Sequence, residues 1–116
     1  MKKNTKQFVL TLDLKDDPKL IEEYEYWHRP ENAWPEIPEG IKKVGILEMN
    51  IFRYKTRLVM IMETKPDFDF ERDMERLSQL PRQEEWEDFV SKFQKSVPGV
   101  PSGEKWQRMK QIFELP

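Results

Sequence analysis

The sequence of 116 residues contains no cysteine, one histidine and only four glycines. The absence of cysteine excludes disulfides, thiolate nucleophiles and zinc–thiolate sites. Four glycines leave little room for a glycine-rich phosphate loop, and His, Asp and Glu show no metal-ligand spacing. No serine or threonine lies in a recognisable nucleophile motif. The sequence therefore predicts no cofactor and no metal, which leaves proton transfer by ordinary side chains, or binding alone.

The sequence also lacks long apolar runs and a large excess of positive or negative charge. The apolar stretch behind the basic N-terminus covers only residues 8–14 and is interrupted by Thr11 and Asp13, which does not fit a secretory signal. No later stretch approaches membrane-spanning length. The formal net charge is -2, with basic residues scattered among acidic ones, which argues against a nucleic-acid or anionic-membrane surface. We expect a cytoplasmic protein that binds neither nucleic acid nor membrane.

The length and composition predict one small domain over residues 1–116. The hydrophobic fraction is 37% and the charged fraction 36%, so the core must be small and the surface heavily solvated. A core of this size often gains buried area from a second subunit. We therefore expect a homo-oligomer.

The first half of the chain predicts a strand, a helix and a hairpin. Apolar residues alternate over 8–14, as in a half-buried strand. Asp16-Asp17-Pro18 is typical of a helix start, and Pro30 ends or kinks that helix because proline disfavours helical angles at the residue before it. Residues 31–45 predict a turn and a short helix stopped by Gly45. Strands are expected over 46–53 and 57–64, the second of them central and covered on both faces.

The second half predicts two more helices and a final strand. Phe70, Met74 and Leu77 have helical spacing after Pro66 and Asp67, and Pro81 can start the next helix. Residues 97–103 are expected to form a loop. Alternation over 109–115 favours a last strand, although a helix also fits this segment. The order strand, helix, strand, strand, helices, strand predicts an α+β fold of the ferredoxin-like, split βαβ type.

The single histidine, His28, is the strongest candidate for proton transfer near neutral pH. It follows Tyr24 by four residues, which places both side chains on one helix face. A Tyr and a His that project together could handle sugar hydroxyls. Spacing alone favours the simpler interpretation of a partly buried helical tyrosine and a surface histidine.

Two tryptophans could form a platform for a sugar ring. An indole face packs on the apolar side of a pyranose while its N–H donates a hydrogen bond, and Trp34 and Trp86 are the candidates. Trp86 shares a helical stripe with Phe89 and Phe93, which also fits an aromatic core. Several glutamates lie near His28 in the sequence, but most carboxylates on so charged a chain are solvated surface.

These residues occur together in a known family. Glu22-Glu23-Tyr24, then His28, then Trp34-Pro35-Glu36 resembles the E-E-Y-x-x-x-H…W-P-E signature of L-rhamnose mutarotases. The similarity continues through Trp86 to the C-terminus, so it covers nearly the whole chain from Phe8.

The resemblance implies a cofactor-free homodimer of ferredoxin-like subunits, a dimeric α/β barrel, that interconverts the α and β anomers of L-rhamnose. It implies that His28 is the catalytic general acid and that Tyr24 contacts the substrate. It also places Trp86 in the sugar pocket, and Met49 at the position of a tyrosine that contacts the sugar in the family. With Trp34 as a platform, the expected substrate-binding residues are Tyr24, Trp34, Met49 and Trp86.

The chain also departs from the family pattern. Two extra residues separate His28 from Trp34, and Glu85 precedes Trp86 where the family commonly has an aromatic pair. These changes are consistent with another deoxy sugar, or a uronic acid, as the substrate. Two alternatives remain open: a cofactor-independent monooxygenase-like dimer that acts on aromatic substrates, and a sugar-binding homologue without catalysis.

Overall fold

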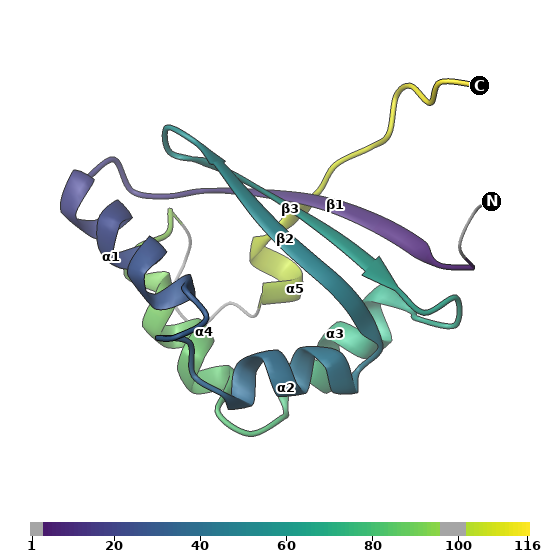
Figure 1. Cartoon of the computed structure of the whole chain (residues 1–116), viewed down its shortest axis with the longest axis horizontal. Helices are drawn as coiled ribbons and strands as arrows, with labels where there is room; N and C mark the ends of the chain where they lie inside the picture. Colours follow the sequence, from purple (N-terminus) through teal and green to yellow (C-terminus); the bar gives the residue numbers. More distant parts are fainter. Residues whose placement is uncertain (1–3, 96–101) are drawn as a thin grey trace.

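The computed structural model describes residues 4–95 and 102–116 as a four-stranded antiparallel sheet with helices on one side (Figure 1). The strands are β1 (Lys6–Asp13), β2 (Ile46–Tyr54), β3 (Arg57–Thr64) and β4 (Gln107–Arg108). Their order in the sheet is β2-β3-β1-β4, and each adjacent pair is antiparallel. This order is that of a ferredoxin-like α+β fold, as predicted.

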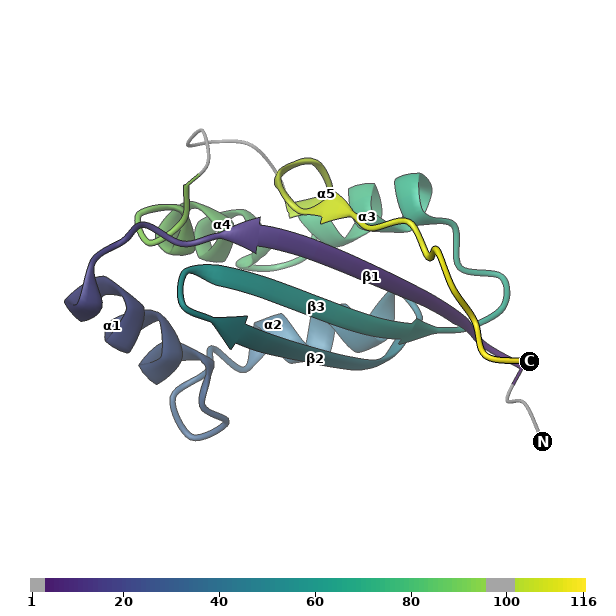
Figure 2. The same ribbon diagram turned by 90° about the horizontal axis from the view of Figure 1, so that it is seen from above.

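Five helices connect the strands. They are α1 (Pro18–His28), α2 (Glu36–Lys43), α3 (Phe70–Ser78), α4 (Gln83–Ser91) and the short α5 (Ser102–Lys105). Figure 2 shows the opposite face of the sheet without a helix over it. The sheet therefore has one face for the core and one face that the described helices leave bare.

Alternation along the strands decides which side chains enter the core. Leu10, Leu12 and Leu14 are buried against the helices, as are Leu58 and Met62 of β3. Their neighbours in sequence point to the bare face, because successive side chains of a strand project to opposite sides. β3 is an inner strand as predicted, but its second face is only half-buried, so the prediction that both faces are covered is not met within this chain.

Most predicted helix and strand boundaries are confirmed within a few residues. Helix α2 ends before Gly45, whose φ of 100° is readily adopted only by glycine. The hairpin between β2 and β3 is confirmed. Helix α4 begins two residues after Pro81, because Arg82 adopts a left-handed conformation at its N-cap.

The prediction of a long last strand is wrong. β4 contains only Gln107 and Arg108, and Met109 N–H donates to Val9 O before the chain leaves the sheet. The residues beyond it have no regular structure, and three apolar side chains there are highly exposed: Ile112 (89%), Phe113 (71%) and Leu115 (80%). An alternating pattern makes a strand only where a neighbouring strand can pair with it.

Of the loop predicted over 97–103, residues 97–101 lie outside the described residues, whereas 102 and 103 belong to α5.

Candidate active site

Helix α1 carries Tyr24 and His28, and its ends are determined by local sequence. The Asp17 side chain caps the first turn by accepting the backbone N–H groups of residues 19 and 20, at 3.0 and 3.2 Å. The helix ends at His28 because Arg29, which precedes Pro30, is extended with ψ of 141°. His28 is therefore the last helical residue, beside a turn that opens to solvent.

The His28 ring is held by two aromatic neighbours and one hydrogen bond. Its centroid lies 4.2 Å from that of Tyr24 and 5.3 Å from that of Trp86, which it meets edge-on. His28 Nδ1 lies 2.7 Å from the backbone oxygen of Tyr24. Because a carbonyl oxygen only accepts hydrogen bonds, Nδ1 must carry the proton and donate it. Nε2 of the neutral ring is then left without a proton and can accept one.

Burial shifts the acidity of both members of this pair. Desolvation of the ring lowers the pKa of His28 below its ordinary value of 6.5, against the hydrogen bond to Tyr24 O, although the residue as a whole remains exposed. Desolvation also raises the pKa of Tyr24 to about 12, against the opposing effect of a hydrogen bond with the Gln94 side chain. At neutral pH the site therefore contains a neutral imidazole and a protonated phenol.

Two tryptophans continue the aromatic surface away from His28. The rings of Trp34 and Trp86 lie 5.1 Å apart at 68°, and both contact Phe89. Trp86 is nearly buried at 9% exposure, whereas Trp34 is half-buried. Of the two, Trp34 has the more accessible surface for a ligand, and Trp86 supports it from the core.

Charged groups surround Trp34. The Arg82 guanidinium lies 4.1 Å from the centroid of the Trp34 ring, and Arg82 also pairs with Glu85. Glu36 Oε1 is buried 3.6 Å from Arg82 Nη1, which is longer than a direct hydrogen bond. A carboxylate oxygen with capacity to accept a further hydrogen bond thus lies beside the guanidinium that packs on Trp34.

The structure does not itself bring Met49 into this cluster. Met49 lies opposite Met62 in the sheet register, and its side chain is on the helix-facing side of β2, half-buried against the core. Four of the predicted site residues, Tyr24, His28, Trp34 and Trp86, are gathered by ring contacts, whereas Met49 is placed only on the same side of the sheet.

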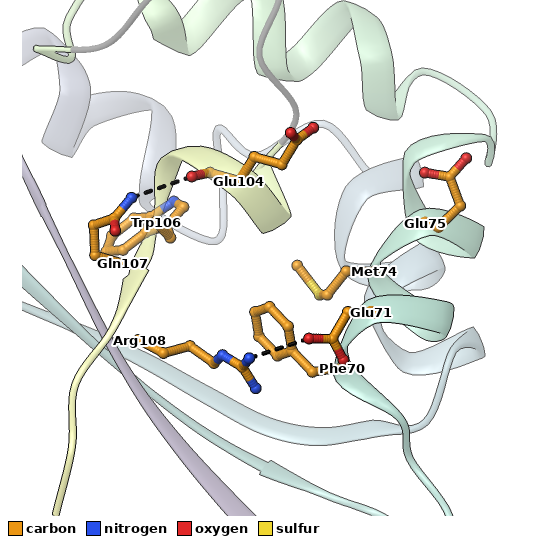
Figure 3. Close-up of a pocket in the computed structure, with 8 residues that line it drawn as sticks. All are labelled: Phe70, Glu71, Met74, Glu75, Glu104, Trp106, Gln107 and Arg108. Atoms are coloured by element: carbon orange, nitrogen blue, oxygen red, sulfur yellow. Dashed lines mark hydrogen bonds and ion pairs between the residues drawn. The ribbon is translucent and has the colours of Figure 1, made fainter.

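A separate cavity of about 340 Å³ lies away from His28, between α3 and the α5–β4 segment (Figure 3). Phe70, Met74 and Trp106 form its apolar part, and an ion pair of 3.1 Å between Arg108 and Glu71 lies at its side. None of the predicted site residues lines this cavity. The predicted site residues therefore lie at the aromatic cluster and not in this hollow.

Within the described residues, no cluster of three His, Cys, Asp or Glu side chains is arranged to hold a metal ion. The helices of this part of the chain are also too short or too polar to span a bilayer.

Comparison with known proteins assigns the family. A sequence model described as L-rhamnose mutarotase matches residues 7–115, which is nearly the whole chain. The chain belongs to the L-rhamnose mutarotase family. The match includes all five predicted site residues, and the family is one of sugar mutarotases, which are isomerases that interconvert anomers.

Two relatives with curated descriptions are similar over most of their length. An L-fucose mutarotase of Xanthomonas campestris pv. campestris is 44% identical over 104 residues, which cover 90% of this chain and 83% of the relative. A UPF0734 protein of Dictyostelium discoideum is 36% identical over 114 residues, which cover 95% of this chain and 90% of that protein.

Solved structures agree with the fold. The crystal structure of an L-rhamnose mutarotase from Formosa agariphila superposes with a TM-score of 0.71 at 18% identity, covering 96% of this chain and 99% of the other. Tetracenomycin F2 cyclase from Streptomyces glaucescens superposes with a TM-score of 0.61 at 16% identity and the same coverage. At such identities the likeness concerns the fold alone, which this mutarotase family therefore shares with a polyketide cyclase.

Several residues around the candidate site were not found by sequence reasoning. Arg82 contacts Trp34 from the N-cap of α4, where its own backbone is left-handed, and no motif signals that contact. Gln94, which follows α4, interacts through its side chain with Tyr24, and Lys105 of α5 donates to Gln94 Oε1. Phe89 was recognised only as part of a core stripe, yet its ring contacts Trp34 and Trp86.

Proposed function

We propose that this protein is a mutarotase for 6-deoxyhexoses, with L-fucose or L-rhamnose as substrate, and that it works in the cytoplasm. The observation that carries the proposal is the state of His28, whose Nδ1 donates to Tyr24 O while the ring packs between Tyr24 and Trp86. This arrangement leaves Nε2 able to accept a proton at the exposed end of α1.

In the proposed reaction, His28 Nε2 removes the proton from the anomeric hydroxyl of the sugar. The bond between the anomeric carbon and the ring oxygen breaks, the ring oxygen takes up a proton, and an open-chain aldehyde forms. After the aldehyde rotates, the ring closes on its other face as the imidazolium returns its proton. A positioned acid or base typically contributes about 10²–10⁴-fold to such a transfer.

The ring oxygen needs its own proton donor, for which we propose the Tyr24 hydroxyl, directly or through a water. Burial raises the pKa of Tyr24 to about 12, so the phenol stays protonated across the physiological range. The Glu36 carboxylate is the alternative group near the site. We propose Trp34 as the platform for the apolar face of the sugar, supported by Trp86, with Met49 completing the wall on the sheet side.

The identity of the sugar rests on similarity. The L-fucose mutarotase of Xanthomonas is 44% identical over 90% of this chain, which favours L-fucose, whereas the family model is described by L-rhamnose. Both sugars carry a methyl group at C5, and the half-buried Trp34 and Met49 provide apolar surface for such a group. We therefore expect a preference for 6-deoxy sugars over their hydroxymethyl counterparts.

We also propose that two copies pair through the bare face of the sheet as a homodimer. Phe52 and Tyr54 of β2 point to this face and are 58% and 72% exposed, and Val59 and Ile61 lie beside them on β3. Apolar patches of this kind on a small protein mark association surfaces. The C-terminal segment leaves the sheet on this same side in Figure 1 and adds further exposed apolar groups.

The test of the function is the rate of anomer exchange measured by saturation-difference NMR. L-fucose, L-rhamnose and their C6-hydroxylated counterparts L-galactose and L-mannose are compared at equal enzyme concentration. We expect faster exchange for a 6-deoxy sugar and a slower response for its hydroxylated counterpart. Binding of a sugar without faster exchange would instead identify a non-catalytic homologue, and no response to any sugar would contradict the proposal.

A further inference from the structure

Exposed apolar side chains are concentrated in two parts of the chain. Among the described residues, eight large apolar side chains are exposed, and only Tyr26 of these lies on a helix. The other seven are Leu47, Phe52 and Tyr54 on β2, and Met109, Ile112, Phe113 and Leu115 beyond β4. Apolar surface gathered in this way, and not scattered singly, indicates contact surfaces.

β2 is an edge strand whose outer side is open to a further strand. The order β2-β3-β1-β4 gives β2 one neighbour, and no strand of the described residues lies beyond it. The strand has nine residues, Ile46–Tyr54, and contains no proline. Edge strands present a row of unpaired backbone N–H and C=O groups, which natural proteins usually cover or interrupt. A register shift near its start, between Ile46 and Glu48, leaves the rest of this edge regular.

Residues 110–116, the C-terminal arm, have a length similar to that edge. Met109 N–H donates to Val9 O at 2.7 Å, after which the arm has no regular structure. In Figure 1 the arm leaves the sheet on the side away from the helices. Phe113 and Leu115 are two residues apart and would share one face of an extended strand, with Ile112 on the other. The arm thus has the side-chain pattern of a strand.

A second copy suits the arm better as a partner than its own chain does. The arm starts at the β4 edge, which is opposite β2 in the sheet order. To reach its own β2 it would cross at least three strand spacings of about 4.8 Å each. That crossing would use about four of its residues even when fully extended, which leaves too few for pairing along the edge.

We propose that the arm of one subunit pairs as an added strand with the outer edge of β2 of a second copy. Phe113 and Leu115 then lie on the bare face beside Phe52 and Tyr54, where cross-strand neighbours of this kind stabilise pairing. Main-chain hydrogen bonds hold such an added strand, and its alternate side chains make the contact specific. A two-fold axis provides the contact twice, so each copy gives an arm and receives one. The inference rests on the proposed homodimer and specifies how its two sheets are joined.

A spin label at the end of the arm tests the contact between chains. The sequence contains no cysteine, so Pro116→Cys provides a single attachment site for a nitroxide. Labelled protein is mixed with an equal amount of unlabelled ¹⁵N protein, and the subunits are allowed to redistribute. The nitroxide should broaden the β2 amide signals of the ¹⁵N chain most strongly. A label at Gln79→Cys, an exposed position on the helical side, is the control and should leave these signals sharp.

Two full-length variants measure what the arm contributes. Phe113→Ser combined with Leu115→Ser should raise the dissociation constant of the dimer about 100-fold, since burying one large apolar side chain typically contributes about tenfold or more. Lys110→Ser changes an exposed polar residue of the same arm and should alter this constant less than about threefold. Analytical ultracentrifugation over a range of concentrations measures both values, and thermal unfolding checks that each variant is folded.

The outcomes separate this inference from the homodimer and from the reaction. A dimer whose label broadens no β2 signal of the other chain, or whose double variant associates like wild type, would overturn the arm pairing and leave the homodimer. Broadening confined to the labelled chain itself would also overturn it, and a monomeric wild type would overturn both. Anomer exchange is recorded on the same samples. Its absence from a protein that shows the broadening between chains would contradict the mutarotase reaction alone.

Discussion

At the scale of single residues, the proposed reaction depends on which nitrogen of His28 carries the proton. Its Nδ1 proton is committed to Tyr24 O, so only Nε2 can exchange a proton with a sugar. The resemblance to the family implied a general acid, whereas this tautomer makes the neutral ring a proton acceptor first. The same group becomes an acid after it has taken up the sugar's proton, so the two descriptions concern successive steps.

A pH profile tests this assignment. Burial lowers the pKa of His28 below 6.5, and protonation removes the acceptor. Enzymatic exchange, after subtraction of the rate without protein, should therefore decrease on acidification, with the midpoint of the decrease below pH 6.5. A decrease centred above pH 6.5, or a rate that rises on acidification, would show that neutral His28 is not the group that starts the reaction.

Single residues also show where sequence reasoning succeeds. Tyr24 and His28 could be paired from their spacing of four, because helix geometry relates such residues directly. Trp34 and Trp86 were found through aromatic character and the family resemblance. The contact between Gln94 and Lys105 could not be predicted from the sequence, because it depends on how α5 packs beside α4. Neither residue belongs to a sequence motif or to a helix or strand periodicity.

At the scale of elements, α1 is the one whose boundaries matter most to the site. Asp17 caps its first turn, and the extended Arg29 ends it directly after His28. Both features follow from residues adjacent in sequence, which is why the helix was predicted correctly. The last strand was predicted wrongly, because strand formation depends on a partner strand that local alternation does not reveal.

The cap of α1 gives a stability prediction with a matched control. Asp17→Ala removes the side chain that accepts two backbone N–H groups and should lower the free energy of unfolding by about 1 kcal/mol. Asp16→Ala removes the same charge one residue earlier, outside the cap, and should change it by less than about 0.5 kcal/mol. Urea unfolding of the three proteins measures both values. Equal losses for the two variants would indicate a charge effect in place of capping.

At the scale of the whole molecule, the bare face of the sheet is the main feature that a single subunit leaves unexplained. One face of β1, β2 and β3 is covered by helices, and the other presents half-buried or exposed apolar groups. The C-terminal segment continues an alternating apolar pattern but has no strand to pair with beyond Arg108. Pairing of two copies would give both features a partner.

Light scattering combined with size exclusion tests this prediction. The wild-type protein should have twice the chain mass of 14.2 kDa. Ile61→Lys places a charge at the centre of the bare face and should shift the mass towards that of the monomer, because an unpaired charge is costly in an apolar contact. Tyr26→Ser removes an exposed aromatic side chain from α1 on the helical side and should leave the mass unchanged. A monomeric wild type would contradict the proposed dimer.

The central claim is that His28 moves the proton in anomer exchange, and the most direct test compares wild type with His28→Asn. Saturation-difference NMR is run on L-fucose and L-rhamnose, with thermal unfolding as the check on folding. Because an asparagine side chain is a poor proton acceptor, we predict that exchange falls by about 10²–10⁴-fold while the unfolding temperature changes little. A folded His28→Asn protein that exchanges anomers at the wild-type rate would contradict the account.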